Sequence, residues 1–173
     1  MPLIEKDFTL EPDANLNVIK FDDPHTHGLT SYDMKAVDFI IEFPDKYVFL
    51  EIKDPDDPMA RSKNREIFYN DFKSDTLRKS LVKKYRDSFI YRWAQKKTDK
   101  PIYYYVLISF SKLKSPDYIA LSDLLRKYLP CKYEQTWKRN LASNCRVVSI
   151  KTWNKSFPEC QIKRISLGSQ SLY

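Results

Sequence analysis

Three ionisable residues lie within two largely apolar segments of the chain, at positions where packing residues are expected. Asp38 lies near the start of segment 37–43, and Glu51 and Lys53 lie near the end of segment 47–54. Burying a charge beside Phe, Ile and Leu side chains costs several kcal/mol unless a partner or a metal ion compensates it. Two carboxylates and one ammonium group in such segments therefore indicate a catalytic site.

The two segments have the pattern of a hairpin with a turn at 44–46. Side chains alternate along a strand, so Glu51 and Lys53 project from the same face. A two-residue turn would place Asp38 across from Glu51 and Lys53, whereas a three-residue loop without a bulge would point it away. The turn thus decides whether the three groups meet.

If they meet, their chemistry suits a hard divalent cation. Mg²⁺ prefers carboxylate, carbonyl and water oxygens, so Asp38, Glu51 and the backbone carbonyl of Ile52 are the expected metal ligands, with Mn²⁺ as the alternative ion. Lys53 would orient or help deprotonate an attacking water and stabilise charge on a departing phosphodiester oxygen. The structural alternative is that Glu51 and Lys53 pair with each other in solvent at the edge of a sheet.

Composition and charge favour a folded protein with a polyanionic partner. The 173 residues suffice for one domain, which we expect to span 1–173. A net charge of +7 favours nucleic acid over an anionic membrane, because no basic amphipathic segment stands apart; a basic surface kept for solubility is the alternative. The chain has only two glycines, which argues against the glycine-rich loops that bind nucleotide phosphates.

The cysteines and the N-terminal residues predict a cytoplasmic protein. The three cysteines, Cys131, Cys145 and Cys160, are odd in number and lack the close pairs of zinc sites, so we expect reduced thiols. Residues 1–10 carry charges and no apolar run, so neither a signal peptide nor a membrane anchor is expected.

Hydrophobic periodicity predicts alternating strands and helices. Besides the hairpin, the pattern indicates strands at 15–21, 102–110, 146–150 and 161–165, and helices from Ser74 to before Pro101 and over 115–130. The strand at 102–110 is almost uncharged and is expected at the centre of the sheet. This order predicts an α/β or α+β class with a mixed central sheet flanked by helices.

The long helix is expected to bury one apolar stripe. Leu77, Leu81, Tyr85, Phe89 and Trp93 recur every four residues. Aromatic residues make up 14% of the chain, and packing explains them before base stacking does.

The arrangement around the hairpin resembles the PD-(D/E)xK nuclease superfamily. Asp38 opens an apolar strand, the sequence Glu51-Ile52-Lys53 ends the next, and a basic helix and a buried strand follow, so that the resemblance covers 37–110 best. It implies a restriction-endonuclease-like fold, with a mixed four-stranded sheet and helices on both sides. It also implies Mg²⁺-dependent phosphodiester hydrolysis, with Asp38 and Glu51 as metal ligands and Lys53 in the active site.

Two positions depart from the pattern of that superfamily. Val37 stands before Asp38 where the motif name has proline, a common variation among members. Many members also carry another acid on a first helix, and the first thirty residues here show no convincing amphipathic helix. Glu5 and Glu11 are the candidates for that acid.

Basic residues of the long helix are candidates for contact with DNA, with a solvated helix face as the alternative. His25 and His27 lie in a polar loop and are expected to be ordinary surface residues. RNA is left open as a substrate, and cutting both strands would need a homodimer. The candidate DNA-binding residues are Lys79, Lys83, Arg86 and Lys97.

Two functions are therefore expected from the sequence. The first is a metal-dependent nuclease acting on DNA through Asp38, Glu51 and Lys53. The second is a catalytically silent domain of nuclease-like fold that binds nucleic acid or a protein partner.

Overall fold

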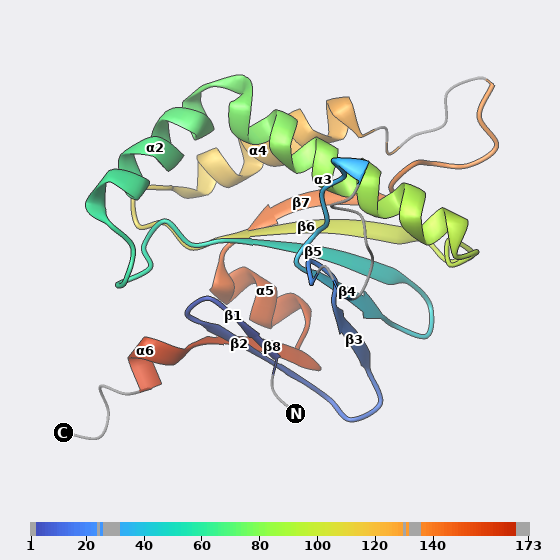
Figure 1. The fold of residues 1–173 in the computed structure, drawn as a ribbon, viewed down its shortest axis with the longest axis horizontal. Coiled ribbons are helices and arrows are strands. Elements are labelled where there is room, and N and C mark those ends of the chain that lie inside the picture. The colour runs from blue at the N-terminus through green and yellow to red at the C-terminus, as the bar shows by residue number, and fades with distance from the viewer. Residues whose placement is uncertain (1–2, 24, 26–31, 130, 132–135, 169–173) are drawn as a thin grey trace.

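A computed structural model of the protein describes residues 3–23, 25, 32–129, 131 and 136–168. Its centre is a mixed five-stranded sheet in the order β3-β4-β5-β6-β7 (Figure 1). Strand β4 runs antiparallel to its two neighbours β3 and β5, and β6 and β7 run parallel to β5. The bounds are β3 Asn17–Lys20, β4 Phe39–Glu42, β5 Tyr47–Lys53, β6 Ile102–Ile108 and β7 Asn144–Val148.

Helices and a second sheet cover the two faces of the central sheet. Helices α2, α3 and α4 lie on one face, and α5 lies on the other with a three-stranded antiparallel sheet in the order β1-β2-β8 (Figure 1). The helices are α2 Ser62–Lys73, α3 Asp75–Ala94, α4 Ser115–Tyr128, α5 Ile150–Ser156 and the short α6 Ile165–Gly168. The strands of the small sheet are β1 Leu3–Glu5, β2 Phe8–Pro12 and β8 Cys160–Arg164.

Each face of the central sheet has its own hydrophobic core. On one face, residues of α3 and α4 such as Leu81 and Leu125 pack against Phe49 of β5. On the other, Trp153 of α5 and Phe8 of β2 pack in the same core as inward-facing residues of β4 and β5. The side chains of β6 alternate between the two cores, as expected for a strand covered on both faces.

The mixed α/β class predicted from the sequence is confirmed. The central sheet has five strands where the resemblance implied four, and the small sheet was not anticipated. Residues 3–12 form two of its strands, whose short length and mixed composition gave no clear periodicity.

Helix α3 follows the predicted pattern in its first part only. Ser74 caps it by accepting a hydrogen bond from the Thr76 N–H at 3.3 Å, and Leu77 and Leu81 are buried. Trp93, predicted to be buried, is 60% exposed although Arg92 beside it is buried, because each four-residue step turns about 40° further around a helix of about 3.6 residues per turn. Lys97 lies beyond the helix, in the loop before β6.

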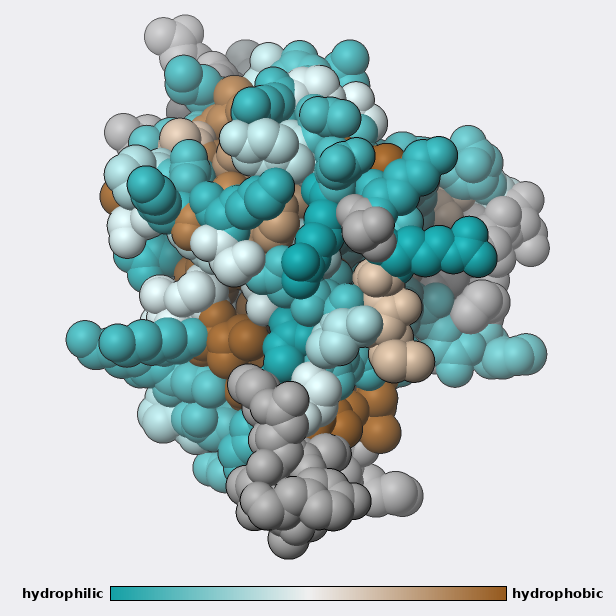
Figure 2. All heavy atoms as spheres, turned by 90° about the vertical axis from the view of Figure 1, so that its left-hand side faces the viewer, coloured by the Kyte–Doolittle hydropathy of each residue, from teal (hydrophilic) through white to brown (hydrophobic). Residues whose placement is uncertain are grey.

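The outer face at the α2 side of the molecule is mainly hydrophilic, with separate small apolar patches (Figure 2). Within the described residues, no helix combines the length and the apolar character needed to cross a membrane.

Candidate active site

The register of the β4–β5 hairpin brings Asp38 across from Glu51. Phe39 pairs with Leu50, and Phe43 N–H donates to the Lys46 carbonyl at 2.9 Å, so the turn itself has two residues. One step beyond Phe39 and Leu50, the same register sets Asp38 opposite Glu51. Residues opposite each other in an antiparallel pair share a face, so the geometry predicted for a two-residue turn is the one observed.

A lysine of α3 bridges the two carboxylates. Lys84 Nζ lies 3.2 Å from Asp38 Oδ1 and 2.7 Å and 2.8 Å from the two oxygens of Glu51. Lys53 Nζ also lies 2.7 Å from Glu51 Oε1. We call the two carboxylates Asp38 and Glu51, together with the Lys84 that bridges them, the lysine-bridged pair.

The sequence did not lead us to expect Lys84 in the site, although its position in the helical pattern indicated it. It follows Leu77 and Leu81 at helical spacing, so it had to face the sheet together with them. A lysine on the buried side of a helix requires a carboxylate partner, and the hairpin strands offered Asp38 and Glu51 among their acids.

Backbone contacts fix Asp38 between the strands. Its Oδ2 accepts the Ile52 N–H at 2.6 Å, and its own carbonyl accepts the Phe21 N–H at 2.8 Å. Lys53 C=O accepts the Ser109 N–H at 2.9 Å on the β6 side. Because backbone groups of successive strand residues point to opposite sides, the Ile52 carbonyl, a predicted ligand, faces the β4 side where Asp38 lies.

Asp38 also belongs to a cluster of three acids, which we call the acidic triad. Carboxylate oxygens of Glu5, Asp22 and Asp38 all lie within 4.8 Å of one another. Lys20 contacts Glu5 at 3.1 Å, and the buried Asp22 Oδ1 has no hydrogen-bond partner among the described residues. This cluster could bind a metal ion.

Glu5 and Asp22 come from different sheets of the fold, Glu5 from the small sheet and Asp22 from the loop after β3 of the central sheet. Glu5 ends β1 just before a tight turn, in which Lys6 has a φ of 54°. Asp22 follows β3 by two residues, in a segment that looked in the sequence like an ordinary polar loop. Of the two candidates for an upstream acid, Glu5 joins Asp38, whereas Glu11 pairs with the exposed Lys163.

Burial and charge shift the protonation of these groups. Burial, and then the Asp38 charge, raise the pKa of Glu51 despite the two lysines beside it. Burial also raises the pKa of Asp22, with further increases from Asp38 and Glu5. Burial alone would lower the pKa of Lys84, but Glu51 and Asp38 outweigh it and raise the pKa well above its usual value. Lys84 is therefore a permanent cation near neutral pH.

The predicted DNA-binding residues do not reach these carboxylates. Lys83 contacts the Asp33 carbonyl and Asp87, Arg86 donates to the Tyr128 carbonyl, and Lys97 lies 3.7 Å from Glu42. Lys79 is exposed on α3.

His25 takes no part in the site as far as the described residues show. His25 N–H donates to Asp23 Oδ1 at 2.9 Å, and its side chain is exposed. His27 lies outside the described residues.

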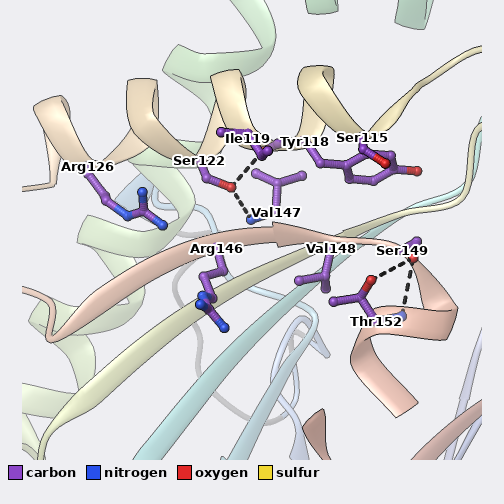
Figure 3. Close-up of a pocket in the computed structure, with 10 residues that line it drawn as sticks. All are labelled: Ser115, Tyr118, Ile119, Ser122, Arg126, Arg146, Val147, Val148, Ser149 and Thr152. Carbon is purple, nitrogen blue, oxygen red and sulfur yellow. Dashed lines mark hydrogen bonds between the residues drawn. The ribbon is translucent and has the colours of Figure 1, made fainter. Parts of the chain in front are cut away.

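A separate cavity of about 380 Å³ lies between α4, β7 and the start of α5 (Figure 3). The Ser122 hydroxyl lines the cavity, where it accepts a hydrogen bond from the Val147 N–H at 2.8 Å and donates one to the Tyr118 carbonyl at 2.6 Å. Arg126 and Arg146 line its other end, and Arg126 is already held by Asp123. None of the carboxylates of the site lines this cavity.

Comparisons of the chain with protein-family models, with curated proteins and with solved structures found no match.

Proposed function

We propose that the protein is a metal-dependent nuclease that hydrolyses phosphodiester bonds in DNA, with Mg²⁺ as its ion and Mn²⁺ as a substitute. The observation that carries the proposal is the position of Asp38, which belongs to both the acidic triad and the lysine-bridged pair. Oxygen ligands for a hard cation and ammonium groups for a phosphate therefore meet at one residue. The resemblance to PD-(D/E)xK nucleases at Asp38, Glu51 and Lys53 supports the same activity.

The oxygen atoms of the acidic triad fit a hard cation. Three carboxylates this close repel one another unless positive charge compensates them. Lys20 contacts Glu5 and Lys84 contacts Asp38, but no cation among the described residues pairs with Asp22. The unpartnered Asp22 Oδ1 is the kind of buried oxygen that a metal ion satisfies. A bound Mg²⁺ would make a nearby water more acidic and polarise the phosphodiester. Asp38, Glu5 and Asp22 would hold it, with Glu51 and the Ile52 carbonyl adjacent.

The two lysines act on the substrate. Lys53 has 23% of its side chain exposed, so its ammonium group can orient the attacking water and donate to a phosphate oxygen. Lys84 keeps its charge because its pKa is raised, and it offsets negative charge that develops on the phosphate. The net charge of +7 attracts the DNA backbone to the protein.

One observation favours the second candidate, a catalytically silent domain that binds nucleic acid or a protein. Lys84 lies within 2.8 Å of both Glu51 oxygens, so lysines alone balance the charges of the lysine-bridged pair. A buried acid satisfied in this way can serve stability without any metal ion.

The deciding experiment is incubation of supercoiled plasmid and single-stranded DNA with the protein in Mg²⁺ or Mn²⁺. We expect cleavage by the parent and by a Lys155→Ala control, whose residue is exposed on α5. Asp38→Ala and Lys53→Ala should abolish it. Cleavage that survives both substitutions overturns the proposed site, and a parent that binds DNA in EDTA but never cuts it supports the silent domain.

Metal binding is measured separately, by electron paramagnetic resonance of Mn²⁺. Asp22→Asn should weaken Mn²⁺ binding at least about tenfold, since even residues behind the ligands of metal sites commonly have effects of that size. Glu11→Gln, an exposed acid paired with Lys163, is the matched control and should leave binding unchanged. Equal affinities in the two variants would exclude the acidic triad as the metal site.

A further inference from the structure

A group of exposed aromatic and apolar side chains lies at the C-terminal end of α3. Trp93 is 60% exposed, Trp137 is 42% exposed and Ile90 is 52% exposed, and all three line one cavity of about 330 Å³ together with Phe89. Large apolar side chains exposed as a group, rather than singly, mark binding sites. We call Phe89, Ile90, Trp93 and Trp137 the tryptophan surface.

The tryptophan surface continues into two cavities lined by cations. Arg139 lines all three cavities, Lys96 lines the second, of about 430 Å³, and Lys100 lines the third, of about 230 Å³. The acid among these lining residues, Asp99, accepts a hydrogen bond from the Tyr47 hydroxyl at 2.9 Å. The surface therefore complements a partner that carries both flat apolar groups and negative charges.

Two further contacts suit such a partner. Arg139 is held in place by Thr98, whose carbonyl accepts one guanidinium N–H at 3.0 Å and whose hydroxyl lies 3.4 Å from another nitrogen. Asn140 lines the first and third cavities, and its buried Oδ1 has no donor among the described residues. An amide oxygen of this kind accepts hydrogen bonds from the amino groups of nucleobases.

We propose that the tryptophan surface binds single-stranded DNA. Bases stack on Trp93 and Trp137, and phosphates lie near Lys96, Lys100 and Arg139. Aromatic platforms beside a cationic groove are the means by which proteins bind single strands, whose base faces are free, whereas the bases of a duplex are already stacked. The choice of DNA rests on the proposed nuclease function, and binding itself needs neither cleavage nor metal.

The surface and the carboxylates are joined by one helix. Trp93 follows Lys84 on α3 by nine residues, which is roughly 14 Å along the helix axis and half a turn around it, so a strand between them also passes around the helix. At one phosphate per ~3.4 Å, a strand needs at least about four nucleotides to extend from one to the other. A strand held at the tryptophan surface is thus within reach of the proposed active site, which makes unpaired or partly unpaired DNA the substrate class.

Tryptophan fluorescence tests the proposal directly. The chain has three tryptophans, and the third, Trp153, is fully buried. In EDTA, oligothymidylate of about twenty nucleotides should quench the fluorescence of Trp93 and Trp137 and bind more tightly than a duplex of equal length. In the double variant Trp93→Phe, Trp137→Phe, only buried emission remains and quenching should disappear.

Anisotropy of labelled oligothymidylate measures the affinity in the same buffer. Trp93→Ala and Trp137→Ala should each weaken binding at least about fivefold. Ile119→Ala, which removes a side chain 62% exposed on α4, is the matched control and should bind like the parent. The assay contains no metal, so an inactive nuclease can still pass it, and an active nuclease can still fail it.

Three results overturn the proposal. The first is a duplex, or single-stranded RNA, that binds more tightly than oligothymidylate. The second is a pair of tryptophan-to-alanine variants that fold by circular dichroism and bind the single strand as well as the parent. The third is a parent that sediments as a dimer without DNA and that Trp93→Ala converts to a monomer, since the surface would then join two copies of the chain.

Discussion

Replacing Lys84 by methionine removes the charge that bridges Asp38 and Glu51. Methionine keeps most of the apolar stem of lysine, so packing against the sheet changes little. Glu51, whose side chain is fully buried, then keeps Lys53 as its cation, at 2.7 Å. The variant thus separates the charge of Lys84 from its volume.

The Lys84→Met substitution should lower the free energy of unfolding by a large amount for a single lysine. Breaking a buried ion pair by removing one partner costs about 3–5 kcal/mol, because a buried charge is left uncompensated. Since Lys53 remains, we expect the lower end, about 3 kcal/mol, which lowers Tm by about 6–12 °C in a chain of this size. Urea denaturation at about pH 8 measures the free energy of unfolding.

The loss should depend on pH. Folding raises the pKa of Glu51 above 4.5, so between those two values the folded state binds more protons and stability falls as pH rises. Without Lys84 that pKa rises further, and the loss should be greater near pH 8 than near pH 5. In the parent, Lys84 contributes stability that is present below pH 10.5 and is lost as pH rises through its raised pKa.

Lys83→Met is the matched control, one residue away on α3. Lys83 is 41% exposed, and its partner Asp87, whose side chain is 13% exposed, keeps the Lys35 N–H as a donor at 2.8 Å, so the loss should stay within about 1 kcal/mol at both pH values. A Lys84→Met variant as stable as this control, or equally destabilised at both pH values, would refute the buried ion pair. Millimolar Mg²⁺ should restore part of the stability of Lys84→Met if the freed carboxylates bind it.

Two further predictions concern residues outside the site. Arg164→Met leaves the fully buried carboxylate of Asp54 without its cation and should lower the free energy of unfolding by about 3–5 kcal/mol in urea denaturation. Lys163, on the same strand, has a side chain that is 61% exposed, so Lys163→Met should cost less than about 1 kcal/mol. Equal losses in the two variants would contradict the role of the Arg164–Asp54 pair. Cys131 is half-buried, and a hydrogen bond with the neighbouring Cys145 thiol lowers its pKa to about 7, whereas burial raises the pKa of Cys160 to about 12. Mass spectrometry should therefore find Cys131 alkylated well before Cys160, and faster above pH 7 than below it. Alkylation of Cys160 first would contradict this order.

The hairpin was predictable from sequence because its rules are local. Alternation along β5 places Glu51 and Lys53 on one face, and the two-residue turn then fixes Asp38 across from Glu51. The contribution of α3 was predictable in principle from helical spacing, but only by treating Lys84 as part of the buried face. Trp93 shows the limit of a four-residue period, since each step turns about 40° further around the helix and Trp93 no longer lies on the buried face where Leu77 begins.

The acidic triad could not be predicted, because its members meet only through long-range pairing. Glu5 reaches Asp38 through a small sheet that β1 and β2 form with β8, which lies near the other end of the chain. No local pattern encodes such a pairing, and the short strands involved have weak periodicity.

Asp38 belongs to two groups, one whose negative charge is compensated by lysines and one that keeps an excess of negative charge. In the lysine-bridged pair, Lys53 and Lys84 compensate the two carboxylates, whereas in the acidic triad Lys20 contacts Glu5 and no cation among the described residues pairs with Asp22. The excess of negative charge therefore lies on the side of Asp38 that faces Glu5 and Asp22, and a cation would bind there. The lysines on the other side leave no such excess at Glu51, so its role as a ligand requires Lys84 to move away, which the Lys84→Met variant imitates.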